Sequence, residues 1–105
     1  MNEIFEKFSM KDQTAVITGG GGLLGKEFCK TLAQAGATIV AADLNLNLAR
    51  QTVELIQEFG GRGIACAVDV TDPESVKAMV DLAVNETGRL DVLVCSAALD
   101  PKFDG

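Results

Sequence analysis

The chain has 105 residues, is 48% hydrophobic and carries a formal charge of −6. This composition fits a globular domain, and the length suffices for one domain but not for two. Its Lys and Arg residues never occur side by side, which excludes nucleic acid and anionic membrane surfaces as partners. No apolar stretch approaches the roughly 18 residues of a membrane span, and the acidic start does not resemble a signal peptide. We therefore expect a cytoplasmic protein.

The residue types that are missing limit the chemistry further. The chain contains no His, Tyr or Trp, so His-based triads and the usual zinc sites are excluded. Cys29, Cys66 and Cys95 lie in apolar segments without Cys-x-x-Cys spacing, and we interpret all three as small buried hydrophobes. The sequence predicts no catalytic residue and no metal site.

The apolar pattern predicts four strands that alternate with three helices. The expected strands cover residues 13–18, 38–42, 63–68 and 91–95. The first helix follows four consecutive glycines and should end at Gly36, which is placed as its C-terminal cap. Its apolar stripe is expected at Leu24, Phe28, Leu32 and Ala35.

The other two helices carry clear start and stop signals. Asn45 is placed to cap the second helix, and Gly60-Gly61 ends it. Its expected apolar positions are Leu48, Ala49, Thr52, Val53, Leu55, Ile56 and Phe59. Asp72 followed by Pro73 starts the third helix, and Gly88 stops it. Its expected buried face consists of Val76, Met79, Val80 and Ala83.

This alternation is typical of a three-layer α/β/α, Rossmann-like fold with a parallel sheet. Right-handed crossovers put the strands in the order 3-2-1-4, with the first two helices on one face and the third on the other. We treat residues 1–105 as a single partial dinucleotide-binding domain, with residues 1–10 as an N-terminal tail. The chain direction reverses between strands 1 and 4, and ligands bind at such switch points.

The glycine-rich turn from Thr18 to Gly25 indicates a pyrophosphate site, because a helix N-terminus offers unpaired N–H groups and a favourable dipole. Gly19 permits the turn, residues 20–22 keep side chains out of the phosphate's path, and Gly25 lets the helix pack on the sheet. Asp43 follows at the end of the second strand, where it can accept hydrogen bonds from both ribose hydroxyls and repel a 2'-phosphate. The expected cofactor is NAD in preference to NADP.

Four blocks in order resemble the short-chain dehydrogenase/reductase family: residues 8–19, Asp43, Asp69-Val70 and residues 88–98. The resemblance implies that the Asp69 side chain takes the adenine amino group and that the Val70 backbone helps to hold the ring. Ser96 and Ala97 would give backbone contacts to the cofactor ribose. The predicted cofactor-binding residues are Gly19, Gly21, Gly22, Leu23, Leu24, Gly25, Asp43, Leu44, Asp69, Val70, Ser96, Ala97 and Ala98.

Two blocks depart from the family pattern. Cys95, Ser96 and Ala98 replace the two Asn and the Gly of the family's Asn-Asn-Ala-Gly motif. Leu23 stands where the non-extended branch has a Gly, so the glycine spacing also fits the extended, epimerase-like branch. Asp69-Val70 and the segment from Gly88 favour the non-extended branch, which acts on alcohols and ketones.

The family's proton transfer relies on a Tyr and a Lys that follow the fourth strand, and this chain has no Tyr. We therefore expect these residues alone to bind NAD weakly or not at all and to turn over no substrate. The apolar fourth strand should be completed by further sequence or by self-association through its edge. A non-catalytic nucleotide-binding or assembly module is an alternative, as is a site for S-adenosylmethionine.

Overall fold

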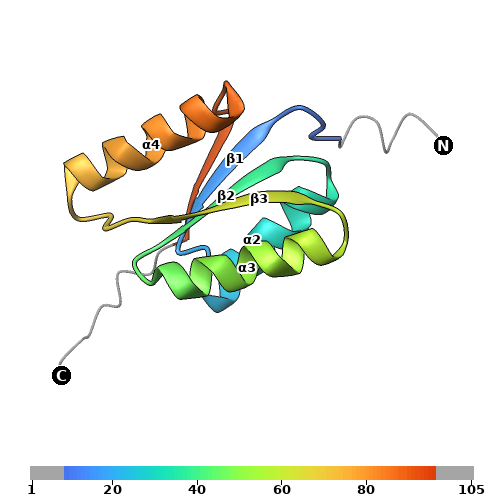
Figure 1. Cartoon of the computed structure of the whole chain (residues 1–105), viewed down its shortest axis with the longest axis horizontal. Helices are drawn as coiled ribbons and strands as arrows, with labels where there is room; N and C mark the ends of the chain where they lie inside the picture. Colours follow the sequence, from blue (N-terminus) through green and yellow to red (C-terminus); the bar gives the residue numbers. More distant parts are fainter. Residues whose placement is uncertain (1–8, 97–105) are drawn as a thin grey trace.

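The computed structural model describes residues 9–96, which fold into a four-stranded parallel sheet with three helices (Figure 1). Ala97 and Ala98 lie outside these residues. The elements in chain order are β1 (Thr14–Thr18), α2 (Leu23–Gln34), β2 (Thr38–Asp43), α3 (Leu46–Glu58), β3 (Arg62–Ala67), α4 (Pro73–Thr87) and β4 (Val92–Cys95).

The strand order is β3-β2-β1-β4 and every pairing is parallel, so the predicted fold class and topology are confirmed. Helices α2 and α3 cover one face of the sheet and α4 covers the other (Figure 1). From β1 the chain continues to β2 and β3 on one side of β1, and it then returns to place β4 on the other side of β1. This reversal places a switch point beside the carboxyl end of β1.

Strand β1 forms the centre of the core, and each of its five residues is buried. Ala15 and Ile17 face α2 and α3, whereas Val16 faces α4. This alternation follows from the two-residue period of a strand. A strand covered on both faces is apolar on both, which explains the hydrophobic run Ala15-Val16-Ile17 between two buried threonines.

The predicted apolar stripe of α2 is wrong in phase. Leu24 is 61% exposed and Phe28 is 38% exposed, whereas the buried face consists of Gly25, Cys29 and Ala33. These residues are small, so the helix axis approaches the sheet closely and the larger side chains are turned outward. Size, rather than hydrophobicity, selects the face that α2 buries.

The expected boundaries are correct to within one residue for most elements. Asn45 caps α3 by accepting from the N–H groups of Asn47 and Leu48, and Asp72 caps α4 with Pro73 in its first turn. Gly88 ends α4 with a φ of +84°. Helix α2 ends at Gln34, with Ala35 as its C-cap, so Gly36 follows the cap instead of forming it and has a φ of +108°.

The interpretation of the cysteines as buried is correct only for Cys29. Cys66 is half-buried and Cys95 is exposed, because both belong to the outer strands of the described sheet and α4 packs mainly against β1 and β2. Leu93, which shares the α4 side of β4, is 48% exposed. This side of β4 is therefore only partly covered by residues 9–96.

The loops that leave the strands are held by backbone hydrogen bonds beyond the last strand residues. Gly20 N–H donates to the Ala42 carbonyl at 2.9 Å, and Val68 N–H donates to the Asp43 carbonyl at 3.0 Å. Ser96 N–H donates to the Thr18 carbonyl at 3.2 Å. The regular pairing of the sheet thus continues into the loops at its carboxyl edge.

Candidate functional site

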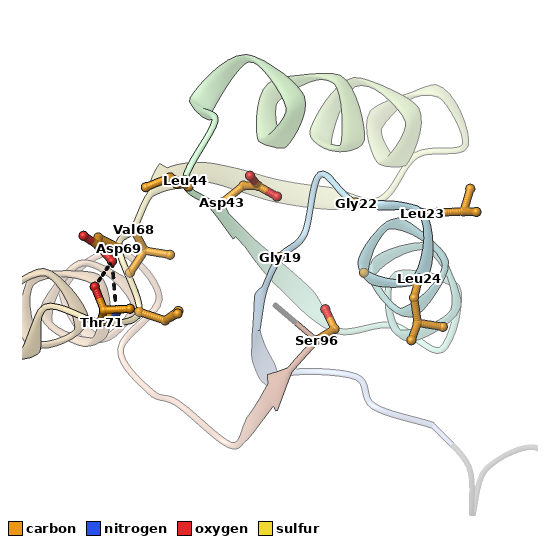
Figure 2. Close-up of a pocket in the computed structure, with 12 residues that line it drawn as sticks. Gly19, Gly22, Leu23, Leu24, Asp43, Leu44, Val68, Asp69, Thr71 and Ser96 are labelled. Carbon is orange, nitrogen blue, oxygen red and sulfur yellow. Dashed lines mark hydrogen bonds between the residues drawn. The ribbon is translucent and has the colours of Figure 1, made fainter. Parts of the chain in front are cut away.

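A pocket of about 450 Å³ opens at the carboxyl edge of the sheet, at the switch point beside β1. The glycine turn and the start of α2 form one side, and the ends of β2 and β3 form the other (Figure 2). Within residues 9–96, every predicted cofactor-binding residue except Gly21 lines this pocket. The structure therefore brings together residues from four separate segments of the chain.

The glycine turn presents the start of α2 to the pocket. Gly19 has a φ of +69°, and its carbonyl accepts from the Gly22 N–H at 3.0 Å. Gly22 is the N-cap and provides no side-chain hydrogen bond to the first turn. Backbone N–H groups at a helix start that lack such a cap are suited to bind an anion, and the helix dipole adds to this preference.

Gly25 is required because the backbone approaches it closely. A Cβ at this position would overlap the Gly19 carbonyl oxygen, would lie 2.7 Å from the Gly19 carbonyl carbon, and would lie 2.8 Å from the Ser96 Oγ. This close approach fixes α2 against the turn and forms a cradle of backbone atoms, where the sequence predicts a pyrophosphate site. A pyrophosphate group fits such a cradle, since Gly19, Gly22 and Gly25 carry no side chain to block it.

The role expected for the middle glycines needs a correction. A Cβ on Gly20 would lie 3.1 Å from the Ala41 Cα, and one on Gly21 would lie 2.8 Å from the Leu48 carbonyl carbon. These two residues are therefore small because they pack against β2 and α3. Of residues 20–22, only Gly22 lines the pocket.

Asp43 joins the end of β2 to the glycine turn. Its Oδ2 accepts from the Gly21 N–H at 2.9 Å, and its Oδ1 accepts from the Asn45 N–H at 2.9 Å. The carboxylate borders the pocket while it makes these bonds. Each carboxylate oxygen has a second lone pair, so hydrogen bonds to a ligand hydroxyl are compatible with this arrangement.

Asp69 and Thr71 lie in the loop from β3 to α4, on the wall of the pocket opposite the glycine turn (Figure 2). The Asp69 Oδ1 accepts from the Thr71 N–H at 2.9 Å and from its hydroxyl at 2.6 Å. Both bonds hold the pKa of Asp69 below its ordinary value, and the bond from the Thr71 hydroxyl is the larger cause. Asp69 belongs to the lining of the pocket, where a carboxylate can act as a hydrogen-bond acceptor.

Ser96 closes the floor of the pocket between β1 and α2. Its hydroxyl donates to the Thr18 carbonyl, which also accepts from its N–H. Ser96 therefore supplies a side-chain bond within the sheet at the position where the family motif has its second Asn. Its hydroxyl is engaged with the backbone of β1, which favours a structural role.

The outer rim of the pocket is apolar. Leu23 is 83% exposed, Leu24 is 61% exposed and Leu44 is 78% exposed. Leu23 is the first residue of α2, a helical position that any L-residue adopts without strain. The replacement of the family's Gly by Leu therefore costs no backbone strain and adds apolar surface at the α2 end of the pocket.

Val68 and Thr71 also line the pocket but were missed by the sequence reasoning. Both flank the Asp69-Val70 pair, so its neighbours were the available signal. Residues 9–96 contain no cluster of three His, Cys, Asp or Glu residues that would hold a metal ion. No helix in that range is long and apolar enough to cross a membrane.

The fold and the pocket define a doubly wound α/β protein with a ligand site at its switch point. The family model described as short chain dehydrogenase matches residues 13–104, and the chain belongs to this family. The match includes nearly the whole of the described structure.

Individual relatives agree with this assignment. The 7alpha-hydroxysteroid dehydrogenase of Escherichia coli (strain K12) is 37% identical over 92 residues, which cover 88% of this chain and 36% of that protein. A crystal structure of hydroxysteroid dehydrogenase from Escherichia coli matches with a TM-score of 0.84 and 37% identity, over 86% of this chain and 38% of that one.

A 7 alpha-hydroxysteroid dehydrogenase complexed with NADH and 7-oxo glycochenodeoxycholic acid matches with a TM-score of 0.83 and 35% identity. That match covers 89% of this chain and 36% of the other. The chain thus spans little more than a third of the length of these relatives.

Proposed function

We propose that this chain is the NAD-binding portion of an oxidoreductase that transfers hydride between a nicotinamide cofactor and an alcohol or ketone. The observation that carries the proposal is the pocket itself, in which an uncapped helix start faces two carboxylates across the carboxyl edge of the sheet. A dinucleotide has a pyrophosphate that can bind at the helix start, and it has hydroxyl and amino groups that can donate to the two carboxylates.

The charges around the pocket support NAD over NADP. None of the described residues that line it is basic, and Asp43 lies at the end of β2. A 2'-phosphate placed there would meet the Asp43 carboxylate without a cation to offset the repulsion. Two ribose hydroxyls would instead donate to that carboxylate, and the exposed side chains of Leu44 and Val70 would cover the faces of the adenine ring.

The proposed contribution of these residues to the reaction is binding. When bound, NAD supplies the carbon that accepts or donates the hydride. The residues of this chain would hold the pyrophosphate at Leu23 to Gly25, orient the ribose at Asp43 and recognise adenine at Asp69. The chain has no Tyr or His for proton transfer, so we expect no steady-state turnover from these residues alone.

Nuclear magnetic resonance (NMR) titration of the isotope-labelled chain with NAD, NADP and S-adenosylmethionine at millimolar concentration tests the proposal, because this method detects weak binding. The proposal narrows the expectation for these residues to weak binding of NAD. We therefore expect NAD to shift the amide signals of Gly22, Asp43 and Asp69, and NADP to shift them less. The Asp43→Ala variant should lose the preference for NAD over NADP. Equal or stronger shifts with S-adenosylmethionine, or none with NAD, would contradict the proposal.

The outer position of β4 supports a second proposal, that the chain self-associates through this strand. Leu93 and Cys95 expose apolar surface on one side of an unpaired edge within the described sheet, and such edges pair with other chains. Light scattering should show a species larger than a monomer, and Leu93→Lys should reduce it. A monodisperse monomer at all concentrations would contradict this proposal.

The proposed location is the cytoplasm. Cys29, Cys66 and Cys95 are all free thiols in the structure, a state that fits a reducing compartment.

A further inference from the structure

The carboxylate of Asp69 is held asymmetrically by one neighbour. Its Oδ1 accepts two hydrogen bonds, from the Thr71 N–H at 2.9 Å and from the Thr71 hydroxyl at 2.6 Å. Within residues 9–96, its Oδ2 accepts no hydrogen bond from another residue. The two oxygens therefore have different roles, since one is occupied by the loop and the other is available to a ligand.

The backbone of Asp69 is fixed as well. Its N–H donates to the Ser75 Oγ at 2.9 Å, and Ser75 belongs to the first part of α4. The Val68 N–H bond to the Asp43 carbonyl holds the preceding residue to β2. With its main chain tied to α4 and β2, the remaining freedom of Asp69 is rotation of the side chain, and the Thr71 hydroxyl restrains that rotation.

Thr71 itself borders the pocket, and in the view of Figure 2 Asp69 lies between Leu44 and Thr71. Leu44 belongs to the loop after β2, where the proposed adenosine site begins. A carboxylate bonded to Thr71 through Oδ1 keeps Oδ2 free for a donor in that site. An amino group on the ligand is a donor of the required kind.

We propose that Thr71 is a positioning residue that orients the Asp69 carboxylate toward the adenine amino group of the cofactor. The inference rests on the proposed function, because it concerns the same pocket. Thr71 acts through Asp69 and need not touch the ring. Only the bond from the Thr71 hydroxyl depends on the side chain at this position, because almost any residue here would supply the backbone N–H. The hydroxyl is therefore the group to remove in a test of this role.

Two substitutions separate the hydroxyl from the rest of the side chain. Thr71→Val keeps the shape and the N–H but removes the O–H, whereas Thr71→Ser retains the O–H. The ligands for the test are NAD and nicotinamide hypoxanthine dinucleotide, in which a carbonyl oxygen replaces the adenine amino group. Dissociation constants for both come from NMR titration, and the pKa of Asp69 comes from its carboxylate signal without any ligand.

We expect Thr71→Val to weaken NAD binding about three- to tenfold, the range for one hydrogen bond, and to leave the hypoxanthine dinucleotide within about twofold. The preference for NAD should shrink accordingly, and Thr71→Ser should restore it. Without ligand, the pKa of Asp69 should rise toward its ordinary value in Thr71→Val, because the hydroxyl is the larger cause of its lowering.

An equal loss for both dinucleotides would overturn the inference, since it would indicate a contact or a packing effect of Thr71 itself. An unchanged NAD preference together with a raised pKa of Asp69 would also overturn it, because the hydroxyl would then stabilise the loop only. Failure of the proposed function would look different. The unsubstituted chain would bind neither dinucleotide, and both proposals would fall.

Discussion

The Asp43 carboxylate accepts a hydrogen bond from the Gly21 N–H at 2.9 Å and so ties the end of β2 to the glycine turn. The side chain expected to bind ribose therefore also supports the turn that is expected to hold the pyrophosphate. A change at Asp43 should affect both ends of the pocket, because one carboxylate belongs to both.

Replacement of Asp43 by Ala should lower the free energy of unfolding by about 1–3 kcal/mol, the cost of removing a charged acceptor from backbone donors. Denaturant unfolding followed by circular dichroism measures this loss. Glu54→Ala is the matched control, since Glu54 is an exposed acid on α3, and should change stability by less than about 0.5 kcal/mol. Equal losses in the two variants would show that the Gly21 bond contributes little.

Gly25→Ala should destabilise the chain by about 2 kcal/mol or more, because its Cβ would overlap the Gly19 carbonyl oxygen and force the turn away from α2. Gly22→Ala is the control from the same turn. Its Cβ would lie 3.3 Å from the Gly19 carbonyl oxygen, and its φ of −77° suits any residue. Thermal unfolding should separate the two variants clearly, and similar midpoints would argue against close packing at Gly25.

Thr52 is fully buried on α3, and its hydroxyl donates to the Gly20 carbonyl at 2.8 Å. Thr52→Val preserves the shape but leaves that carbonyl without this donor, so we expect a loss of about 1–2 kcal/mol in the free energy of unfolding. Thr31→Val changes an exposed Thr on α2 and should have little effect. A neutral Thr52→Val would mean that the hydroxyl does not support the turn.

Acid should weaken the start of the sheet through Asp91. The pKa of Asp91 lies below its ordinary value of 3.8, first because of the Arg89 side chain and then because of the Thr14 N–H. A lowered folded-state pKa gives a contribution that is present above the ordinary value and is lost as the pH falls through the lowered one. Between about pH 5 and pH 2, the unsubstituted chain should therefore lose more stability than Asp91→Asn. Thermal unfolding at several pH values measures this difference. An equal loss of stability in the two proteins across that range would refute this assignment.

Much of the fold was predictable because its signals are local. The strand order followed from the alternation of elements, and the caps at Asn45 and Asp72 followed from residue type. The buried face of α2 was not predictable from apolar spacing, because Gly25 and Ala33 are selected by the distance between helix and sheet. The exposure of Cys95 depends on what covers β4, which no local pattern encodes.

The candidate site shows the same division. Gly19 and Asp43 were identified from spacing and Asp69 from the family resemblance, and all three line the pocket. Gly21 was assigned to the phosphate path but packs against α3, since a turn has an inner and an outer side that sequence does not distinguish. The neighbouring Thr71 makes a loop-capping role of Asp69 foreseeable from the sequence, but the bond to the Thr71 hydroxyl depends on loop geometry.

The hydrogen bonds that extend the sheet into its loops, from Gly20, Val68 and Ser96, imply that the pocket is preorganised. A ligand that enters a loop already ordered by the sheet loses little conformational entropy in the protein, so more of the contact energy appears as affinity. Amide hydrogen exchange at these three residues should accordingly be slow before any ligand is added. Substitutions that loosen these bonds would weaken binding through the entropy of the free chain, without changing a single group that the ligand touches.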